Sequence, residues 1–399
     1  MPVLSSVARR LYEERPFEGL TVGACLHVTA ETANLLVALR DGGARVVACA
    51  SNPLSTQDDV AASLLLDEAM SIYAVRGENL ERYYHHLDAV AATTPQLTLD
   101  DGCDLVSRLH QQGEPSLAEA VGGTEETASG VLRLRAMERA GVLAYPIVAV
   151  GDCATNRLAD NRHGTGQSTL DGLIRATNVL LAGRRLVVAG YGQCGKGIAA
   201  RARGLGALVT VTEIDPLRAL EAVMDGFQVD PMTVAARYGE IFVTATGSRD
   251  VIGAEHFALM GDGAILLNAG HFDIEIDVVT LGALAGGRRR AVRPAVEELE
   301  VRSEGGDTKR LLLVSEGRVV NLSAAEGHPS SVMDLSFAIQ ALCAEWIVGH
   351  RGELEPRVYD VPGEIDTEVA RLKLASMGIE LDVLDDAQQA YLESWTVGT

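Results

Sequence analysis

The fold class is indicated by one stretch of the chain, Leu186-Val-Val-Ala-Gly190-Tyr-Gly192-Gln-Cys-Gly195-Lys-Gly197. Its four apolar residues are typical of a buried strand, and the glycines that follow permit a tight turn into a helix. A G-x-G-x-x-G spacing after such a strand predicts a turn at which a dinucleotide pyrophosphate approaches a helix N-terminus.

The acidic residue Glu213 supports this prediction. It lies at the end of the next expected strand, 23 residues after Gly190, near the offset of about 20 residues at which a carboxylate binds the ribose hydroxyls. A carboxylate there would repel a 2′-phosphate. The sequence therefore favours NAD over NADP as cofactor, although the cationic Arg218 is close by.

Apolar strands and helical segments alternate on both sides of this motif. Strands are expected at Leu20–Cys25, Ala44–Cys49, Leu208–Thr212, Ile241–Thr244 and Ala264–Leu267. The alternation predicts βαβ units and an α/β fold with two doubly wound, Rossmann-like domains.

The position of the glycine motif in the second half of the chain suggests the domain order. We expect a substrate domain over residues 1–152, completed by 329–375, an NAD-binding domain over 153–328, and a C-terminal tail over 376–399. The helix expected at Val332–Val348 would cross back to the first domain, and its apolar surface could serve an oligomer interface. Hinges near residues 152 and 329 would close the cleft between the domains on a ligand.

The composition excludes several classes of protein. With 34 basic and 55 acidic residues the net charge is −21, which argues against nucleic acid and anionic membrane surfaces as partners. The apolar run Gly141–Gly151 is shorter than the roughly 20 residues that cross a membrane, and we expect a buried strand there. The six cysteines form no C-x-x-C pair, so we expect neither a disulfide framework nor a metal site. Without a recognisable signal peptide, the expected location is the cytoplasm.

Polar clusters follow the apolar runs, as they do where strand ends line a site. One such cluster is more often a turn or a helix cap, but this many together predict a single site between the domains. They are Leu26–Thr32, Asn52–Asp59, Leu99–Gly102, Thr124–Gly130, Asp160–Ser168, Asn268–Asp273 and Asn321–Pro329.

Through these clusters nearly the whole chain resembles the S-adenosyl-L-homocysteine hydrolase family. The segments Gly164–Thr169 and Ala390–Thr399 look like its shorter-tailed branch. The resemblance implies tightly held NAD that oxidises the 3′-hydroxyl of an adenine nucleoside. The ketone then acidifies C4′–H, the 5′ substituent leaves by β-elimination with or without the addition of water in its place, and NADH restores the hydroxyl. It also implies a homo-oligomer, a tetramer or a dimer.

The resemblance implies roles for individual residues. Acid–base and oxidation roles fall to His27, Asp101, Glu126, Asp160 and His271. Substrate contacts fall to Leu26, Thr29, Glu31, Gln57, Phe272, His328 and Met333. Cofactor contacts fall to Thr127, Ser129, Asn161, Gly190, Gly192, Gln193, Cys194, Gly195, Glu213, Arg218, Thr246, Gly247, Asn268, Ala269, Gly270 and Asn321.

One position departs from the family pattern. The family has a lysine four residues before the aspartate that matches Asp160, and this chain has Asn156 there. An asparagine cannot accept the 3′-hydroxyl proton, and the only lysines are Lys196, Lys309 and Lys373.

Three functions are compatible with this change. The one we favour from sequence is a diverged enzyme, lacking the lysine, that dehydrates an adenine nucleoside to an exocyclic enol ether, with His163 or Asp160 as the replacement base. The second is ordinary hydrolysis of S-adenosyl-L-homocysteine to adenosine and homocysteine. The third is a non-catalytic protein that binds NAD and a nucleoside.

Overall fold

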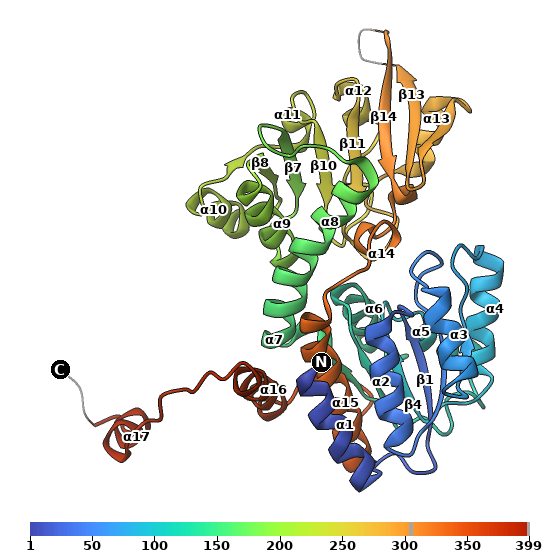
Figure 1. Ribbon diagram of the computed structural model, residues 1–399, viewed down its shortest axis with the longest axis vertical. Coiled ribbons are helices and arrows are strands. Elements are labelled where there is room, and N and C mark those ends of the chain that lie inside the picture. The colour runs from blue at the N-terminus through green and yellow to red at the C-terminus, as the bar shows by residue number, and fades with distance from the viewer. Residues whose placement is uncertain (303–305, 397–399) are drawn as a thin grey trace.

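The computed structural model describes residues 1–302 and 306–396 and shows two lobes, each built on a mainly parallel sheet (Figure 1). The first sheet has seven parallel strands in the order β15-β6-β5-β4-β1-β2-β3. Its strands are β1 (Thr21–Leu26), β2 (Arg45–Ala50), β3 (Ser71–Tyr73), β4 (Leu97–Asp100), β5 (Gly122–Glu125), β6 (Ile147–Ala149) and β15 (Val358–Asp360).

Helices cover both faces of this sheet. They are α1 (Pro2–Glu14), α2 (Ala30–Asp41), α3 (Asp58–Leu66), α4 (Leu80–Ala91), α5 (Asp104–Gln112), α6 (Ala128–Arg139), α15 (Ser330–Gly349) and α16 (Gly363–Ser376). The largest core cluster lies where α1, α2 and α15 pack on one face, and two smaller clusters fill the other face.

The second sheet has the order β12-β13-β14-β11-β10-β7-β8-β9. It is parallel except at one edge, where β12–β13 and β13–β14 pair antiparallel. Its strands are β7 (Arg185–Ala189), β8 (Leu208–Thr212), β9 (Gln228–Val229), β10 (Ile241–Thr244), β11 (Ala264–Asn268), β12 (Arg289–Arg293), β13 (Val296–Arg302) and β14 (Thr308–Val314). Its helices are α8 (Thr165–Thr177), α9 (Gln193–Gly204), α10 (Pro216–Met224), α11 (Met232–Ala235), α12 (Ala254–Leu259), α13 (Val278–Ala285) and α14 (Val320–Ser323), with the short turn η3 (Ser315–Gly317).

The two lobes are joined by two crossings of the chain. The first runs through η1 (Val150–Asp152), α7 (Ala154–Asn156) and the π-helical segment η2 (Arg157–Gly164) into α8. The second returns from α14 to α15, which packs beside α1 and α2 (Figure 1). The predicted α/β class is therefore confirmed, and the expected strands shift by only one residue at their ends.

Helix α15 is an interior helix. Among the described residues it alone is long and apolar enough to cross a membrane, but 61% of its apolar window is buried in the protein. Only Ser330, Ser331 and Gly349 are exposed. The helix is therefore mainly a core element, and its part in an oligomer interface stays a prediction.

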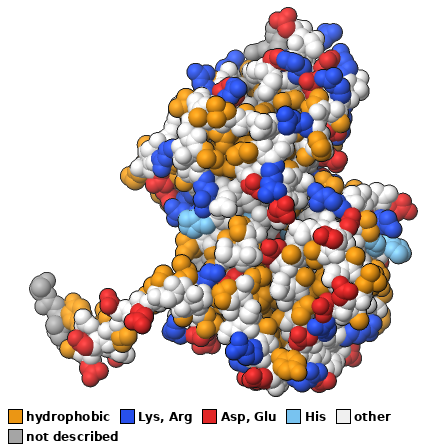
Figure 2. Space-filling model, in the orientation of Figure 1, with side chains coloured by type: hydrophobic (Ala, Val, Ile, Leu, Met, Phe, Trp, Pro, Cys, Tyr) orange, Lys and Arg blue, Asp and Glu red, His pale blue; other side chains and the backbone are white. Residues whose placement is uncertain are grey.

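The remaining segments differ from expectation in detail. Of the apolar run Gly141–Gly151, only β6 forms a strand. The polar stretch Gly305–Arg310, whose composition predicts a hairpin turn at the surface, lies partly outside the described residues, and from Thr308 onward it belongs to β14. The expected tail is described as far as residue 396; it carries α17 (Asp386–Glu393), which lies away from both lobes (Figures 1 and 2).

Candidate active site between the lobes

A cavity of about 1340 Å³ lies between the lobes. The carboxyl ends of strands from both sheets line it, including Leu26 at the end of β1, Asp101 after β4, Glu126 after β5 and Gly190 after β7. The carboxyl ends of parallel strands are where open α/β sheets bind their ligands.

The glycine turn between β7 and α9 has the shape that a dinucleotide requires. Gly190 has a φ of +96°, and a Cβ atom there would lie 2.7 Å from the carbonyl oxygen of Ala245. A Cβ atom on Gly195 would lie 1.9 Å from the carbonyl oxygen of Gly190, so the close packing of α9 on the turn needs glycine. Gly192 begins the helix without a side-chain cap, which leaves the first backbone N–H groups of α9 available to a phosphate.

Glu213 is fixed at the end of β8 by the backbone. Its carboxylate accepts hydrogen bonds from the N–H groups of Tyr191 at 2.7 Å, Ile214 at 2.7 Å and Asp215 at 3.0 Å. Both Glu213 and Arg218 line the cavity. The carboxylate is thus positioned for ribose hydroxyls beside the phosphate-binding turn, and the residues present fit a bound NAD.

A buried carboxylate that the sequence did not reveal supports the far wall of this cavity. Glu275 is 1% exposed, and its oxygens accept hydrogen bonds from the Thr246 N–H at 2.9 Å, the Thr246 hydroxyl at 2.7 Å and the Gly247 N–H at 2.9 Å. A Cβ atom on Gly270 would lie 2.0 Å from its Oε1. Glu275 belongs to no recognisable motif, so only its contacts identify it.

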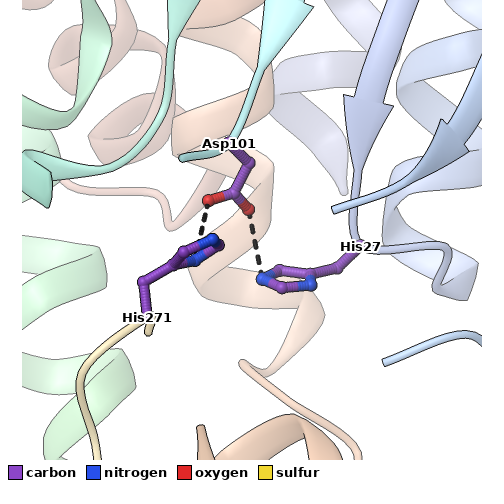
Figure 3. Close-up of side chains that lie close together, drawn as sticks. All are labelled: His27, Asp101 and His271. Atoms are coloured by element: carbon purple, nitrogen blue, oxygen red, sulfur yellow. Dashed lines mark ion pairs between the residues drawn. The ribbon is translucent and has the colours of Figure 1, made fainter. Parts of the chain in front are cut away.

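A cluster of His27, Asp101 and His271 joins the two lobes (Figure 3). His27 Nε2 lies 3.2 Å from Asp101 Oδ2, and His271 Nδ1 lies 3.5 Å from Asp101 Oδ1. On its other side, His27 Nδ1 contacts the hydroxyls of Ser55 at 2.7 Å and Ser51 at 3.0 Å.

Burial shifts the pKa of each member of this cluster in the direction that favours the neutral form of the side chain. It lowers the pKa of His27 to about 3, lowers the pKa of His271, and raises the pKa of Asp101 to about 6. Two imidazoles and a carboxylate are also a ligand set for metals, and their ligating atoms lie within 4.8 Å of one another. Hydrogen bonds and ion pairs account for the cluster as an acid–base group, and we assign no metal to it.

Two pairs of adjacent acidic residues, Asp100–Asp101 and Glu125–Glu126, lie behind this cluster. In each pair one side chain binds the backbone and the other lines the cavity. Asp100 accepts hydrogen bonds from the N–H groups of Asp101 at 3.0 Å and Val106 at 2.8 Å, which shapes the loop. Glu125 likewise accepts from the N–H groups of Gly102 and Thr127. The second member of each pair, Asp101 or Glu126, lines the cavity.

Glu126 is held from helix α15. The side-chain amide of Gln340 donates a hydrogen bond to Glu126 Oε2, and both residues are buried. Burial, followed by repulsion from Asp160 and Asp101, raises the pKa of Glu126 well above its usual range. A carboxyl group in this state can donate a proton.

The wall that carries Asn156 is also built from α15. The Ser336 hydroxyl lies 2.5 Å from Asn156 Oδ1 and 3.4 Å from Asp160 Oδ2. His328 Nδ1 lies 3.2 Å from the same Asp160 oxygen. Asp160 and His328 line the cavity.

Five of the residues predicted from sequence do not line the cavity, each for a structural reason. Asn156 is buried against Ser336, and Gly195 packs inside the turn. Asn268 holds its own loop through the Gly270 N–H and the Phe272 carbonyl. Gln57 accepts a hydrogen bond from the Ala30 N–H, and the Phe272 ring lies against His271 and Arg133.

All other predicted site residues line the cavity. They are His27, Asp101, Glu126, Asp160, His271, Leu26, Thr29, Glu31, His328, Met333, Thr127, Ser129, Asn161, Gly190, Gly192, Gln193, Cys194, Glu213, Arg218, Thr246, Gly247, Ala269, Gly270 and Asn321.

Two family models match the chain. Residues 1–121 match S-adenosyl-L-homocysteine hydrolase, and residues 161–327 match its NAD-binding domain. The adenosylhomocysteinase of Aquifex aeolicus is 56% identical over the whole chain and 94% of its own length. The S-inosyl-L-homocysteine hydrolase of Methanopyrus kandleri is 53% identical over the whole chain and 93% of its own length.

Among solved structures, the NAD⁺-bound 3-phosphoglycerate dehydrogenase of Entamoeba histolytica covers 83% of this chain and 95% of its own. Its identity is 12% and its TM-score 0.44, a slight likeness that adds nothing on function. The full-length relatives and the family models confirm the predicted NAD-binding domain. The chain belongs to the S-adenosyl-L-homocysteine hydrolase family.

Proposed function

We propose that the protein hydrolyses the 5′-thioether of S-adenosyl-L-homocysteine to adenosine and homocysteine, with NAD as a resident cofactor. One observation carries the proposal: a dinucleotide turn on the second lobe and an acid–base cluster built from both lobes line a single cavity. The names of relatives more than 50% identical over the full chain support this reaction above dehydration.

When bound, NAD accepts a hydride from the 3′ carbon and later returns it. The ketone that results makes the C4′ proton acidic, and the cluster of His27, Asp101 and His271 supplies neutral imidazoles and a carboxylate to remove it. Glu126, whose pKa burial raises well above the usual range, supplies a proton to the departing sulfur. One water must then add at C5′ in place of the thiolate before the ketone is reduced, because elimination alone would give an enol ether. Asp101 and Glu126 are buried, which limits the access of further water to the intermediates.

The base-binding end of the cavity suits adenine. Thr29 and Glu31 line the cavity next to His27, and the Thr29 hydroxyl caps helix α2 by accepting from the Thr32 N–H. A carboxylate such as Glu31 accepts hydrogen bonds and so favours an amino group on the purine.

Dehydration of an adenine nucleoside is a second candidate because of Asn156. The side chain that replaces the family lysine is 1% exposed and faces Ser336, so it offers the 3′-hydroxyl no base. Loss of water from a 5′-type hydroxyl would give an exocyclic enol ether by the same oxidation and elimination.

Incubation of NAD-loaded protein with S-adenosyl-L-homocysteine, and separately with adenosine-type nucleosides, decides between these reactions. We expect stoichiometric release of homocysteine thiol from the thioether. An enol ether from a nucleoside without thiol release would overturn hydrolysis in favour of dehydration. Nucleoside binding with neither product and no absorbance at ~340 nm would leave only a binding protein.

We also infer that the protein is a homo-oligomer, a dimer or a tetramer. Its C-terminal segment exposes Leu381, Val383, Leu392 and Trp395, and none of α17 is buried. Such apolar side chains on a projecting segment (Figure 2) are suited to contact a second copy. Light scattering should give a mass of two or four chains, and removal of residues 377–399 should lower it.

A further inference from the structure

Asp160 is a carboxylate of the cavity that shares a contact residue, Ser336, with Asn156. It lies in η2 four residues after Asn156, is 9% exposed, and lines the cavity. Its contacts with His328 and Ser336 both use Oδ2. Among the described residues none donates a hydrogen bond to Oδ1, so this oxygen remains available to a ligand.

No lysine takes over from the missing one. Lys196 Nζ forms an ion pair with Glu221 at 2.5 Å, and Lys373 Nζ forms one with Asp334 at 2.8 Å. Lys309 donates to the carbonyl of Ala258 in the core of the second lobe.

The other suggested base, His163, is also misplaced. It is exposed on η2, its Nδ1 lies 3.4 Å from Arg201 Nη2, and it does not line the cavity. The suggestion that His163 is the replacement base is therefore wrong.

We propose that Asp160 accepts the proton of the substrate 3′-hydroxyl directly and passes it to Nδ1 of His328, which stores it until the hydroxyl is restored. This inference rests on the proposed function, because both candidate reactions begin with 3′ oxidation. The O–H bond breaks, its proton goes to Asp160 and then to His328, and the hydride of the 3′ carbon goes to NAD. The return step reverses each transfer.

The surroundings of His328 suit it for holding a proton. Burial lowers its pKa, but the adjacent Asp160 carboxylate and the hydrogen bond to it raise the pKa above the ordinary value overall. Asp101 and Glu31 add to this effect, and the other imidazole facing it is His27.

A protonated His328 also has an N–H group on Nε2, and a hydrogen-bond acceptor is available for it. His328 Nε2 lies 3.2 Å from the Thr165 hydroxyl and 3.3 Å from the Asn321 amide. Asn321 Oδ1 is buried without a partner. Turning that amide over, which leaves its shape unchanged, brings Oδ1 to the Nε2–H of a protonated His328.

Asn156 acts as a positioning residue in this arrangement. The Ser336 hydroxyl has one proton and donates it in the 2.5 Å hydrogen bond to Asn156 Oδ1. Its distance to Asp160 Oδ2 is 3.4 Å, and no proton is left for a hydrogen bond there. Asp160 Oδ2 is thereby left to His328. An asparagine can therefore stand where the lysine stood without removing a route for the proton.

Stopped-flow absorbance at ~340 nm after mixing NAD-loaded protein with nucleoside tests the relay. We expect D160N to slow reduction of the cofactor about 100-fold or more, the usual contribution of a general base. D171N is the matched control: Asp171 on α8 is half-buried, pairs with Arg175 and does not line the cavity, so this variant should react like the wild type. In H328Q the rise of the rate with pH should lose the inflection that titration of His328 produces.

A second measurement does not depend on turnover. In histidine-labelled protein, NMR titration should show a lower His328 pKa in D160N than in wild type. If the cofactor is reduced in D160N at the same rate as in the wild type, or if the His328 pKa is unchanged in D160N, the relay is overturned while the proposed function stands. No reduction in the wild type with any nucleoside would overturn the proposed function and, with it, the relay.

Discussion

Replacing Asp101 with asparagine should stabilise the protein while removing its activity. Burial raises the pKa of Asp101 from an ordinary 3.8 to about 6. An ionised Asp101 at pH 7 therefore costs the folded state about 3 kcal/mol, at about 1.36 kcal/mol per pKa unit. Asparagine is nearly the same size and carries no charge to desolvate.

The sign of the pH dependence follows from the raised pKa. Below about pH 4 the carboxyl is neutral in both the folded and the unfolded chain, so it makes no difference there. As pH rises to about 6, only the folded protein keeps the proton, so its stability falls and then stays level. The advantage of D101N should therefore grow from pH 4 to pH 6 and remain constant above.

Melting temperatures of NAD-loaded wild type and D101N between pH 4 and pH 8 measure this effect. At pH 7 we expect D101N to melt on the order of 6–12 °C higher, if 1 kcal/mol shifts a domain of this size by about 2–4 °C. Asp59 is exposed at the start of α3, so D59N is the control and should change nothing. A D101N protein that melts no higher than wild type at pH 7, or with a difference independent of pH, would refute the reasoning.

Three further changes test other parts of the site. G195A places a Cβ atom 1.9 Å from a backbone oxygen and should weaken NAD binding more than tenfold by calorimetry, whereas G204A, at the open end of the same helix, should not. E213A removes the carboxylate beside the phosphate turn; direct titration should show weaker NAD binding and a smaller preference over NADP, and an unchanged preference would contradict the role of Glu213. Arg133 lies 5.6 Å from the centre of the Phe272 ring across the cleft and also pairs with Asp104, so the ring is the partner to change; at about 0.5–1 kcal/mol for such a contact, F272L should raise KM about two- to fivefold with kcat little changed.

Local patterns in the sequence determined much of the fold. The strand at Leu186–Ala189, the glycines after it and the acidic residue at 213 act through backbone shape over a few residues, which a linear sequence displays directly. The alternation of apolar strands with helices determined the α/β class for the same reason. The whole-length resemblance then carried the family and the cofactor.

The same local patterns did not indicate which residue of each adjacent acidic pair faces the cavity. At the end of a strand, neighbouring side chains point to opposite sides, so one of each pair enters the cavity and the other binds the loop. Packing decided that Asp101 and Glu126 face the ligand, while Asp100 and Glu125 hold backbone N–H groups.

Contacts between distant parts of the chain were decided only by the tertiary structure. His271 reaches Asp101 from the other lobe, and Ser336 reaches Asn156 from a helix 180 residues later. No residue spacing in the sequence predicts such contacts, because they depend on how the two sheets and helix α15 pack against one another. From the sequence, the family resemblance thus predicted a lysine at the position where this chain has Asn156, and the structure showed that Ser336 faces this asparagine, because hydrogen-bond partners are set by packing in three dimensions.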